Sequence, residues 1–511
     1  MGTRGLVKST ILVTGITGIG LVLSFLSSVV TASKFGVGGE MDIYLSAISL
    51  PTFAITIIAG ILASTFMPSF LEYEREGKTD LWVVVSGILN IYAGISLLIC
   101  AVVILFPRPI MVLLAPGFNP LKIEKAAALL RLSIPTFFLS TINELAAGLF
   151  YSRRRFVLPS LTRVISPMLT ILYVLFFAPT MSTRSLVFAT LTATFIQTAV
   201  ISLGLRTLDG FRYHFVLGFR HPAIRRIFRL ALPLALTMPL YKAVPLFDRW
   251  IGSMLPEGSI STLGYATRLL NVIQPVLISG IAVSFFAIMA QQAADKDYRE
   301  VRESMGKCIG MLLFCSIPIV ALLSCFGRPV VRLLFERGSF LPRDTRATHI
   351  ALSIYLLSLP WSLAGTIIGQ GFYILKDTRT PALLGIAETI VYIVLCWFLV
   401  PMLGVYAVPV AYSSYFFLSV LVLLHFLSRR LGQDLFAFLW PPFAKQLIGA
   451  GAAIAGGVLF RLVLPDRRPF DMLPLALGFV VYFLVLKYAL GSTEADRLHS
   501  LLESRLRRAK P

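Results

Sequence analysis

Long blocks of apolar residues run through most of this chain and leave few polar residues to cover a water-exposed surface. Of its 511 residues, 57% are hydrophobic and only 14% are charged, and the mean hydropathy is +0.83. A soluble protein of this size needs many more polar residues. Blocks of about 20 apolar residues have the length that crosses a bilayer as a helix. The sequence therefore predicts an all-α integral membrane protein.

Counting these blocks predicts about 14 transmembrane helices. The first block follows Arg4 and Lys8 without a small-residue cleavage site after it, so we expect it to remain as a helix. The predicted spans are 9–32, 42–70, 81–106, 126–149, 158–178, 185–205, 227–250, 262–290, 307–327, 347–374, 381–400, 404–427, 446–464 and 472–490.

The net charge of +21 is distributed as a membrane topology would place it. With the N-terminus in the cytoplasm, the cytoplasmic segments hold about twice as many Lys and Arg as the outer ones. The basic segments 153–155 and 206–229 are then cytoplasmic, whereas the arginine-rich loop 328–346 lies outside and departs from the trend. Both termini are expected in the cytoplasm, and the excess charge is expected to contact anionic membrane lipids rather than nucleic acid.

Residues that usually carry cofactor or enzyme chemistry are scattered. The five cysteines and five histidines show no C-x-x-C pair and no ligand cluster, so neither a disulfide framework nor a metal site is expected. No G-x-x-x-x-G-K-[ST] motif is present, which argues against nucleotide hydrolysis by a P-loop. In the outer loop 328–346, Glu336 and Asp344 lie within an arginine-rich segment, which suggests a gate or a headgroup contact, so we expect no enzyme and no cofactor.

Two pairs of segments repeat at one interval of about 220 residues. PRPIMVLLAPGFNP (107–120) is similar to GRPVVRLLFERGSFLP (327–342), and GLFYSRRRFVLPS (148–160) is similar to QGFYILKDTRTPA (370–382). The interval contains six predicted spans, an even number, so the two halves are expected to form a parallel repeat with the substrate site at their interface. The predicted division is 1–206 (N-lobe), 207–226 (cytoplasmic inter-lobe loop), 227–430 (C-lobe), 431–490 (the last two spans) and 491–511 (basic cytoplasmic tail).

A group of cations falls inside the first two spans of the second half. Arg268 lies a turn or two into its span, where it either faces a cavity or reaches back to the interface. Lys242 and Arg249 are seven residues apart and are expected to share one helix face, and Asn271 and Gln274 continue the face of Arg268. A guanidinium offers a planar fork of donors to a phosphate, so the expected guest is an anion.

Other ionisable residues within the spans leave two interpretations open. Arg163 is near enough to a cytoplasmic end to reach the interface, and Arg131 is a further buried candidate. Glu144 and Glu388 are either ion or proton sites, or neutral carboxyl groups hydrogen-bonded in the core.

Several motifs, in this order and spacing, resemble the MurJ/MviN family of lipid II flippases in the multidrug/oligosaccharidyl-lipid/polysaccharide (MOP) exporter superfamily. The resemblance covers the first twelve spans. It rests on KFGVGGEMDIYLSAISLP (34–51), LLAPGF (113–118), FDRWIGSMLPEGSISTLGYATRL (247–269), LLFERGSF (333–340) and GFYILKDTRTP (371–381).

The resemblance implies a monomeric transporter in the bacterial cytoplasmic membrane that moves a polyprenyl-diphosphate-linked saccharide, usually lipid II, from the inner to the outer leaflet. It further implies two six-helix lobes in a V around a cationic cavity, with the last two spans forming a groove for the lipid tail. Arg268 matches the family's cavity arginine and Asp42 its span-2 aspartate. Asp248 matches an acidic position linked to a coupling cation, Na⁺ or H⁺, in some members.

The chain departs from the family at the first two helices. Where the family carries arginines, this sequence has Leu21, Ser27 and Thr56. The hydroxyls of Ser27, Ser46 and Thr56 are expected to bond sugar hydroxyls instead. Another polyprenyl-linked glycan, such as an exopolysaccharide or O-antigen unit, is therefore an alternative substrate, and a drug exporter of the same superfamily is a more distant one.

Overall fold

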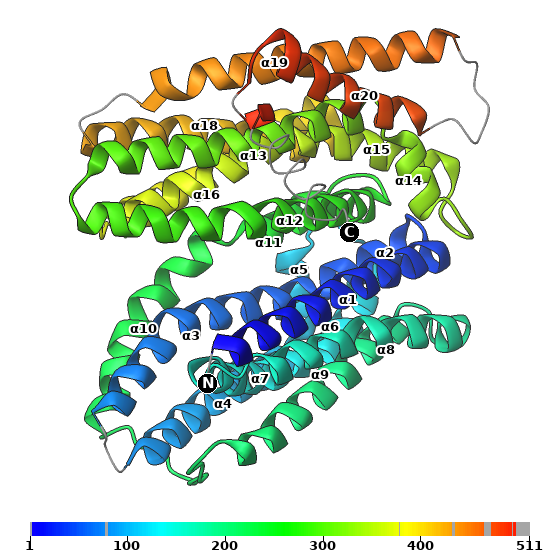
Figure 1. Cartoon of the computed structure of the whole chain (residues 1–511). Helices are drawn as coiled ribbons and strands as arrows, with labels where there is room; N and C mark the ends of the chain where they lie inside the picture. The colour runs from blue at the N-terminus through cyan, green and yellow to red at the C-terminus, as the bar shows by residue number, and fades with distance from the viewer. Residues whose placement is uncertain are drawn as a thin grey trace. The chain divides into compact units, whose positions relative to one another are not determined.

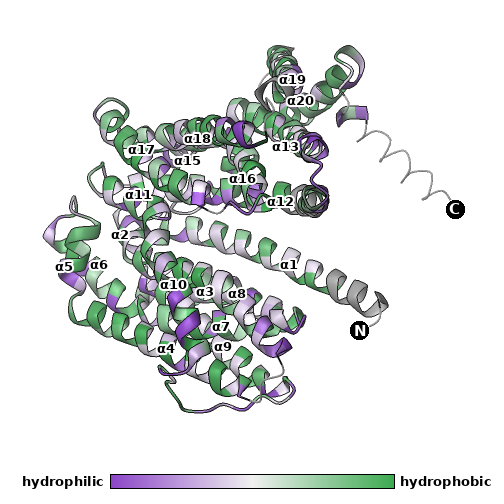
Figure 2. Cartoon of the chain, turned by 90° about the vertical axis from the view of Figure 1, so that its left-hand side faces the viewer, coloured by the Kyte–Doolittle hydropathy of each residue, from purple (hydrophilic) through white to green (hydrophobic). Residues whose placement is uncertain are grey.

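The computed structural model describes residues 3–76, 80–377, 379–431, 435–463, 472–492 and 494–496. Every regular element in this part of the chain is helical, and its helices are apolar along most of their length (Figures 1 and 2). Most of the predicted basic tail, 491–511, lies outside the described residues. The prediction of an all-α fold is confirmed.

The chain divides into two compact units. Unit 1 contains residues 1–261 and 337–340, and unit 2 contains residues 262–336 and 341–511. The helices of unit 1 are α1 (Thr3–Phe35), α2 (Gly39–Ala47), α3 (Ser49–Arg75), α4 (Leu81–Leu105), α5 (Pro107–Leu114), α6 (Pro120–Ser133), α7 (Pro135–Ser152), α8 (Val157–Met181), α9 (Arg184–Gly204), the short η1 (Leu205–Thr207), α10 (Pro222–Tyr241) and α11 (Val244–Ser253).

Helix α12 (Ser259–Ala294) begins in unit 1 and continues as the first helix of unit 2. The remaining helices of unit 2 are α13 (Tyr298–Phe326), α14 (Arg328–Phe335), α15 (Pro342–Leu356), α16 (Leu359–Ile374), α17 (Arg379–Leu403), η2 (Gly404–Tyr406), α18 (Ala407–Leu431), α19 (Leu435–Val463), α20 (Leu473–Leu484) and η4 (Val485–Ala489).

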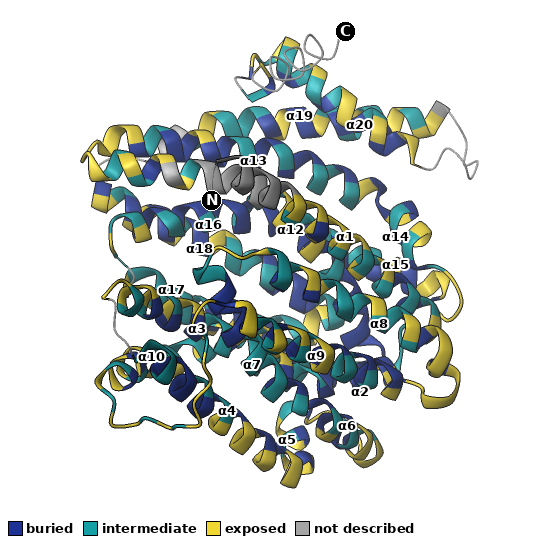
Figure 3. Cartoon of the chain, turned by 60° about the horizontal axis from the view of Figure 1, so that its bottom comes forward, coloured by how far each residue is buried: buried dark blue, intermediate teal, exposed yellow. Residues whose placement is uncertain are grey.

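Eleven stretches of the described residues are long and apolar enough to cross a membrane. One of them, Arg379–Leu431, covers two predicted spans because α17 and α18 follow each other with only a short turn between them. The predicted span 262–290 lies within α12, and the last predicted span corresponds to α20 and η4. Many residues along these helices are exposed (Figure 3). A large number of them have large apolar side chains, as expected for surfaces that face lipid. The chain is a multi-pass membrane protein.

Backbone geometry repeats at the interval found in the sequence. Left-handed residues recur in the pairs Gly36 and Gly258, Arg154 and Lys376, and Ser182 and Gly404. The members of each pair are separated by about 220 residues, as the sequence repeat requires. Helices α8 and α17, each of 25 residues, follow the second pair. The second and third pairs have one member in each unit, so these two turns occur once in unit 1 and once in unit 2.

The prediction that Lys242 and Arg249 share one helix face is wrong. The predicted span 227–250 is two helices, because α10 ends at Tyr241 and α11 starts at Val244. Pro245 has no amide hydrogen to donate to the Tyr241 carbonyl, and its ring would clash with that carbonyl in a continuous helix. Lys242 follows the last residue of α10, so it does not share a helix face with Arg249.

Candidate functional site

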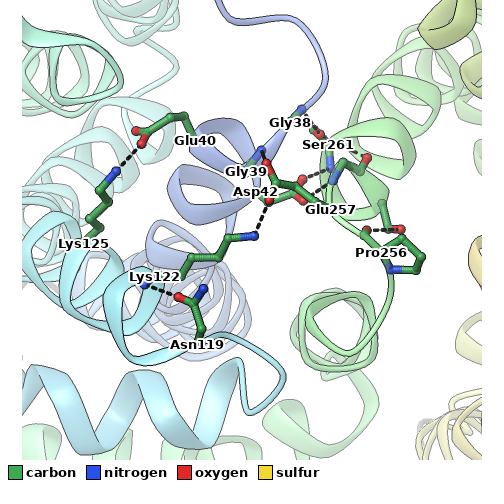
Figure 4. A network of polar contacts seen from close by, with 12 residues as sticks. Gly38, Gly39, Glu40, Asp42, Asn119, Lys122, Lys125, Pro256, Glu257 and Ser261 are labelled. Atoms are coloured by element: carbon green, nitrogen blue, oxygen red, sulfur yellow. Dashed lines mark hydrogen bonds and ion pairs between the residues drawn. The ribbon is translucent and has the colours of Figure 1, made fainter.

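The N-termini of α2 and α12 lie side by side in unit 1 and cap each other (Figure 4). The Asp42 carboxylate on α2 accepts hydrogen bonds from the backbone amides of Gly258, at 2.6 Å, and Ser261, at 2.7 Å. In return, the Glu257 carboxylate accepts from the Gly39 amide at 2.9 Å, and the Ser261 hydroxyl accepts from the Gly38 amide at 3.2 Å. Each helix thus supplies the acceptors that the start of the other requires.

This reciprocal capping has a simple physical cause. The first amide groups of a helix have no partner within the helix, and the helix dipole favours negative charge there. Asp42 is only 3% exposed, and a buried carboxylate is costly unless it is hydrogen-bonded. Its two bonds to the start of α12 satisfy the carboxylate and the amides at once.

Two lysines of α6 join the same cluster. Lys122 Nζ lies 2.7 Å from Glu257, and Lys125 Nζ lies 2.6 Å from Glu40 on α2. The Lys122 ammonium, followed by the Gly39 amide, holds the pKa of Glu257 below its usual range. Glu257 therefore stays ionised, and its capping bond persists until the pH falls through that lowered value.

Close backbone contacts explain two of the glycine motifs. Gly36 adopts a positive φ of 58°, and a Cβ there would lie 2.2 Å from the Ser339 carbonyl oxygen. Gly117, in the LLAPGF segment, donates its amide to the Ser253 hydroxyl at the end of α11. A Cβ at Gly117 would lie 2.2 Å from the Ser253 carbonyl oxygen, so only glycine fits. Both contacts belong to unit 1: the first lies just before α2, and the second joins the segment before α6 to the end of α11.

Arg249 contacts the same end of α12. Its guanidinium donates to the Ile260 carbonyl at 3.1 Å, next to the Ser261 amide that Asp42 binds. Asp248, beside it on α11, is half-buried, whereas Lys242 is exposed. The structure therefore brings Arg249 and Asp42 together at the start of α12.

Arg268 lies farther along α12, in unit 2. It is half-buried, and its guanidinium carbon is 6.0 Å from the centre of the Tyr265 ring. Tyr265 is buried and packs on Phe335, with ring centres 5.5 Å apart. Helical spacing puts Asn271, which is exposed, and the half-buried Gln274 on the side of α12 that carries Arg268.

The hydroxyl groups predicted to bond the sugar differ in how exposed they are. Ser27 is half-buried and Thr56 exposed, and each donates to a carbonyl of its own helix, of Ser24 and Thr52 respectively. Leu21 is exposed, whereas Ser46 is fully buried and its hydroxyl has no hydrogen-bond partner among the described residues. In this conformation Ser46 is not accessible to a substrate.

Two further intramembrane candidates, Arg163 and Glu388, each have a polar partner. Arg163 on α8 is exposed and donates to the Tyr151 hydroxyl at 3.0 Å. Glu388 on α17 is half-buried and accepts from the Ser419 hydroxyl at 2.6 Å. Within the described ranges, no group of three or more His, Cys, Asp or Glu side chains is arranged to hold a metal ion.

These features define a class: a multi-pass helical membrane protein built from two repeats, with intramembrane cations on its helices. The family described as Lipid II flippase MurJ matches residues 31–467, so the chain belongs to that family.

Individual relatives agree with this assignment. The chain is 27% identical over 487 residues to "Probable lipid II flippase MurJ" of Vibrio cholerae, covering 90% of each chain. Its fold is similar to that of "Lipid II flippase MurJ, inward closed conformation", with a TM-score of 0.79, 22% identity, and coverage of 94% of this chain and 99% of the other. It is also similar to a multidrug resistance MATE family transporter of the MOP superfamily, with a TM-score of 0.65, 16% identity, and coverage of 83% and 98%.

The sequence analysis did not predict five members of the capped cluster: Glu40, Glu257, Ser261, Lys122 and Lys125. Glu257 and Ser261 lie within a recognised motif, but neither residue type signals a helix cap to a partner more than 200 residues away. The two lysines lie just before a predicted span, so the sequence suggests only that they are charges at the membrane interface.

Proposed function

We propose that this protein is a lipid II flippase, a transporter and not an enzyme, which moves the polyprenyl-diphosphate-linked saccharide from the inner to the outer leaflet by alternating access. The observation that carries the proposal is Arg268, held half-buried on a helix whose start is capped by the buried Asp42. Membership of the lipid II flippase MurJ family supports this substrate.

In this proposal Arg268 binds the diphosphate, because its planar fork of donors matches phosphate oxygens. Arg249, Lys242 and Arg163 contribute further positive charge, and Asn271 and Gln274 offer hydrogen bonds next to Arg268. The exposed Thr56 and half-buried Ser27 are suited to bond sugar hydroxyls, and Asp42 positions α12. The protein works as a monomer and without a nucleotide, and anionic lipids contact its basic cytoplasmic segments.

The proposal is tested by rescue of bacteria depleted of their own lipid II flippase. Full rescue is expected, with the Arg268→Ala variant at equal abundance as the negative control. Binding of the purified protein to lipid II is compared with binding to a polyprenyl diphosphate that carries neutral sugars. Failure of well-expressed protein to rescue, together with preference for the neutral glycan, would support the alternative substrate that Leu21, Ser27 and Thr56 suggest.

Transport is further proposed to depend on a coupling cation, Na⁺ or H⁺, at Asp248, with Glu388 as a second candidate. Carboxylates within membrane segments are rare and usually functional. Asp248→Asn is expected to lower transport several-fold and to remove its dependence on the cation gradient. Transport is measured in proteoliposomes with and without that gradient. Asp209→Asn, at a side chain 90% exposed outside the spans, is the matched control. Unchanged gradient dependence in Asp248→Asn would reject the role.

Both termini are proposed to lie in the cytoplasm of a bacterium, which places Arg154 inside and Arg343 outside. Both side chains are exposed, so a cysteine at either position should react with a thiol reagent that reaches it. In intact cells, a membrane-impermeant reagent is expected to label Arg343→Cys and to spare Arg154→Cys until the cells are opened. Labelling of Arg154→Cys from outside would overturn this orientation.

A further inference from the structure

The segment that leads into α10 is an extended loop with an unusual face. Residues 208–221 contain no helix, and every second side chain from 211 to 219 is aromatic or leucine. Four of these side chains are at least half exposed: Tyr213 (52%), Phe215 (87%), Leu217 (50%) and Phe219 (62%). In Figure 3 this segment is drawn mostly in yellow and teal beside α10. Such a surface is unfavourable in water, which requires an explanation.

Contacts with α4 show where the segment runs. The Phe211 ring packs edge-on against Trp82, with ring centres 5.1 Å apart. Farther along, the His214 amide donates to the Ser86 hydroxyl at 3.0 Å. The segment therefore climbs along α4, from its first turn towards its middle.

Asn90 holds the tip of the segment. Its amide nitrogen donates to the Val216 carbonyl at 2.8 Å and to the His214 carbonyl at 3.3 Å. Its side-chain oxygen accepts from the Tyr213 hydroxyl at 2.6 Å. The one side chain thus satisfies polar groups on both sides of Phe215.

The segment then runs back to the N-terminal end of α4, where it began. Leu217 lies against Gly87, where an added Cβ would be 3.5 Å from the Leu217 carbonyl oxygen. His221 Nε2 lies 2.9 Å from Asp80, immediately before α4. Residues 211–221 therefore form a hairpin that rises from Trp82 to Asn90 and descends to Asp80. We call this segment the 211–221 hairpin.

The depth of its tip follows from helix geometry. All of Leu81–Leu105 is a candidate membrane span. At 1.5 Å per residue, Asn90 lies about 13 Å along the helix from Leu81, inside the span rather than at its edge. Irregular backbone at such depth is tolerated only where its polar groups have partners. Ser86 and Asn90 supply these partners, which accounts for two polar residues in an otherwise apolar stretch of α4.

We propose that the 211–221 hairpin is inserted into the membrane and that its partner is lipid. The aromatic and leucine side chains contact acyl chains of the adjacent leaflet, with Phe215 at the greatest exposure. Arg212 and Arg220, both exposed, lie towards the open end of the hairpin, where guanidinium groups meet lipid phosphates. The segment expected from the sequence to be a cytoplasmic loop is thereby an anchor that holds the start of α10 to α4.

The test uses the full-length protein in liposomes, with all native cysteines replaced and one environment-sensitive fluorophore attached at Phe215→Cys. Nitroxide groups on lipid acyl chains are expected to quench this probe strongly, and iodide in the water weakly. The same probe at Asp209→Cys, outside the hairpin and 90% exposed, should show the reverse. Equal iodide quenching at both positions overturns the proposal, as does a probe at 215 that neither quencher reaches, because protein would then cover it.

A second variant tests the role of Asn90. Asn90→Leu keeps the side-chain volume but removes the bonds to the tip, so iodide quenching at 215 is expected to rise several-fold. Ser96→Ala is the control, because this buried hydroxyl of the same helix bonds only to the Ala93 carbonyl. Unchanged quenching in Asn90→Leu contradicts the anchoring role. Both readouts are independent of transport, so they separate failure of this proposal from failure of the proposed function.

Discussion

Arg268→Ala is expected to abolish lipid II transport while the protein accumulates in the membrane at its normal level. The cation is half-buried in a membrane helix, where an arginine costs roughly 2.5–3.5 kcal/mol, so removing it does not impair insertion. Losing one charge-assisted pair with the diphosphate costs at least about 2 kcal/mol, or roughly 30-fold in binding. Growth of flippase-depleted cells and membrane abundance are measured together.

Arg268→Lys separates substrate binding from a merely interfacial role. Lysine keeps the charge but lacks the planar fork, so only partial rescue is expected. If Arg268 simply reached to the membrane interface, lysine would replace it without loss. Arg131→Ala is the matched control. The sequence suggested that Arg131 is buried, but the structure shows it exposed, in the last turn of α6, where it donates to the Ile104 carbonyl. Normal growth with Arg268→Ala would contradict the binding role.

The sequence predicted the helical membrane fold because the apolar blocks by themselves determine it. It did not predict the breaks within those blocks. The predicted span 126–149 is divided at Ile134 between α6 and α7, and the predicted span 347–374 at Leu357–Ser358 between α15 and α16. Pro135 is the first residue of α7, and Pro360 is the second residue of α16. Apolar residues lie on both sides of such a break, so the hydropathy pattern alone does not predict where one helix ends and the next begins.

The site was predictable only where it consists of side chains with unusual chemistry. Arg268 was predicted because it is a charged residue within an apolar span, and Asp42 was predicted from the resemblance to the family. The partners of Asp42 are backbone amides of Gly258 and Ser261, and every residue but proline has such an amide. The pairing of α2 with α12 joins segments far apart in sequence, so it could not be inferred from either segment alone.

That pairing leads to a second strong effect, at Asp42. Asp42→Asn preserves the shape of the side chain but replaces one acceptor oxygen with an NH₂ donor facing a backbone amide. A buried donor left without an acceptor costs about 1–3 kcal/mol. The variant is therefore expected to unfold at a lower temperature and to lose most transport, because the start of the helix that carries Arg268 is no longer fixed. Thermal unfolding of the purified protein and rescue of depleted cells measure the two effects.

Glu257→Gln provides the matched control within the same cluster. Glu257 also caps a helix start through a backbone amide, at Gly39, and also becomes a neutral amide in the variant. Its side chain is 59% exposed, whereas Asp42 is 3% exposed, so water can replace the lost acceptor at Glu257 and cannot do so at Asp42. The loss of stability should therefore be clearly smaller in Glu257→Gln. Equal losses in the two variants would show that burial of the Asp42 carboxylate is not what makes its cap important.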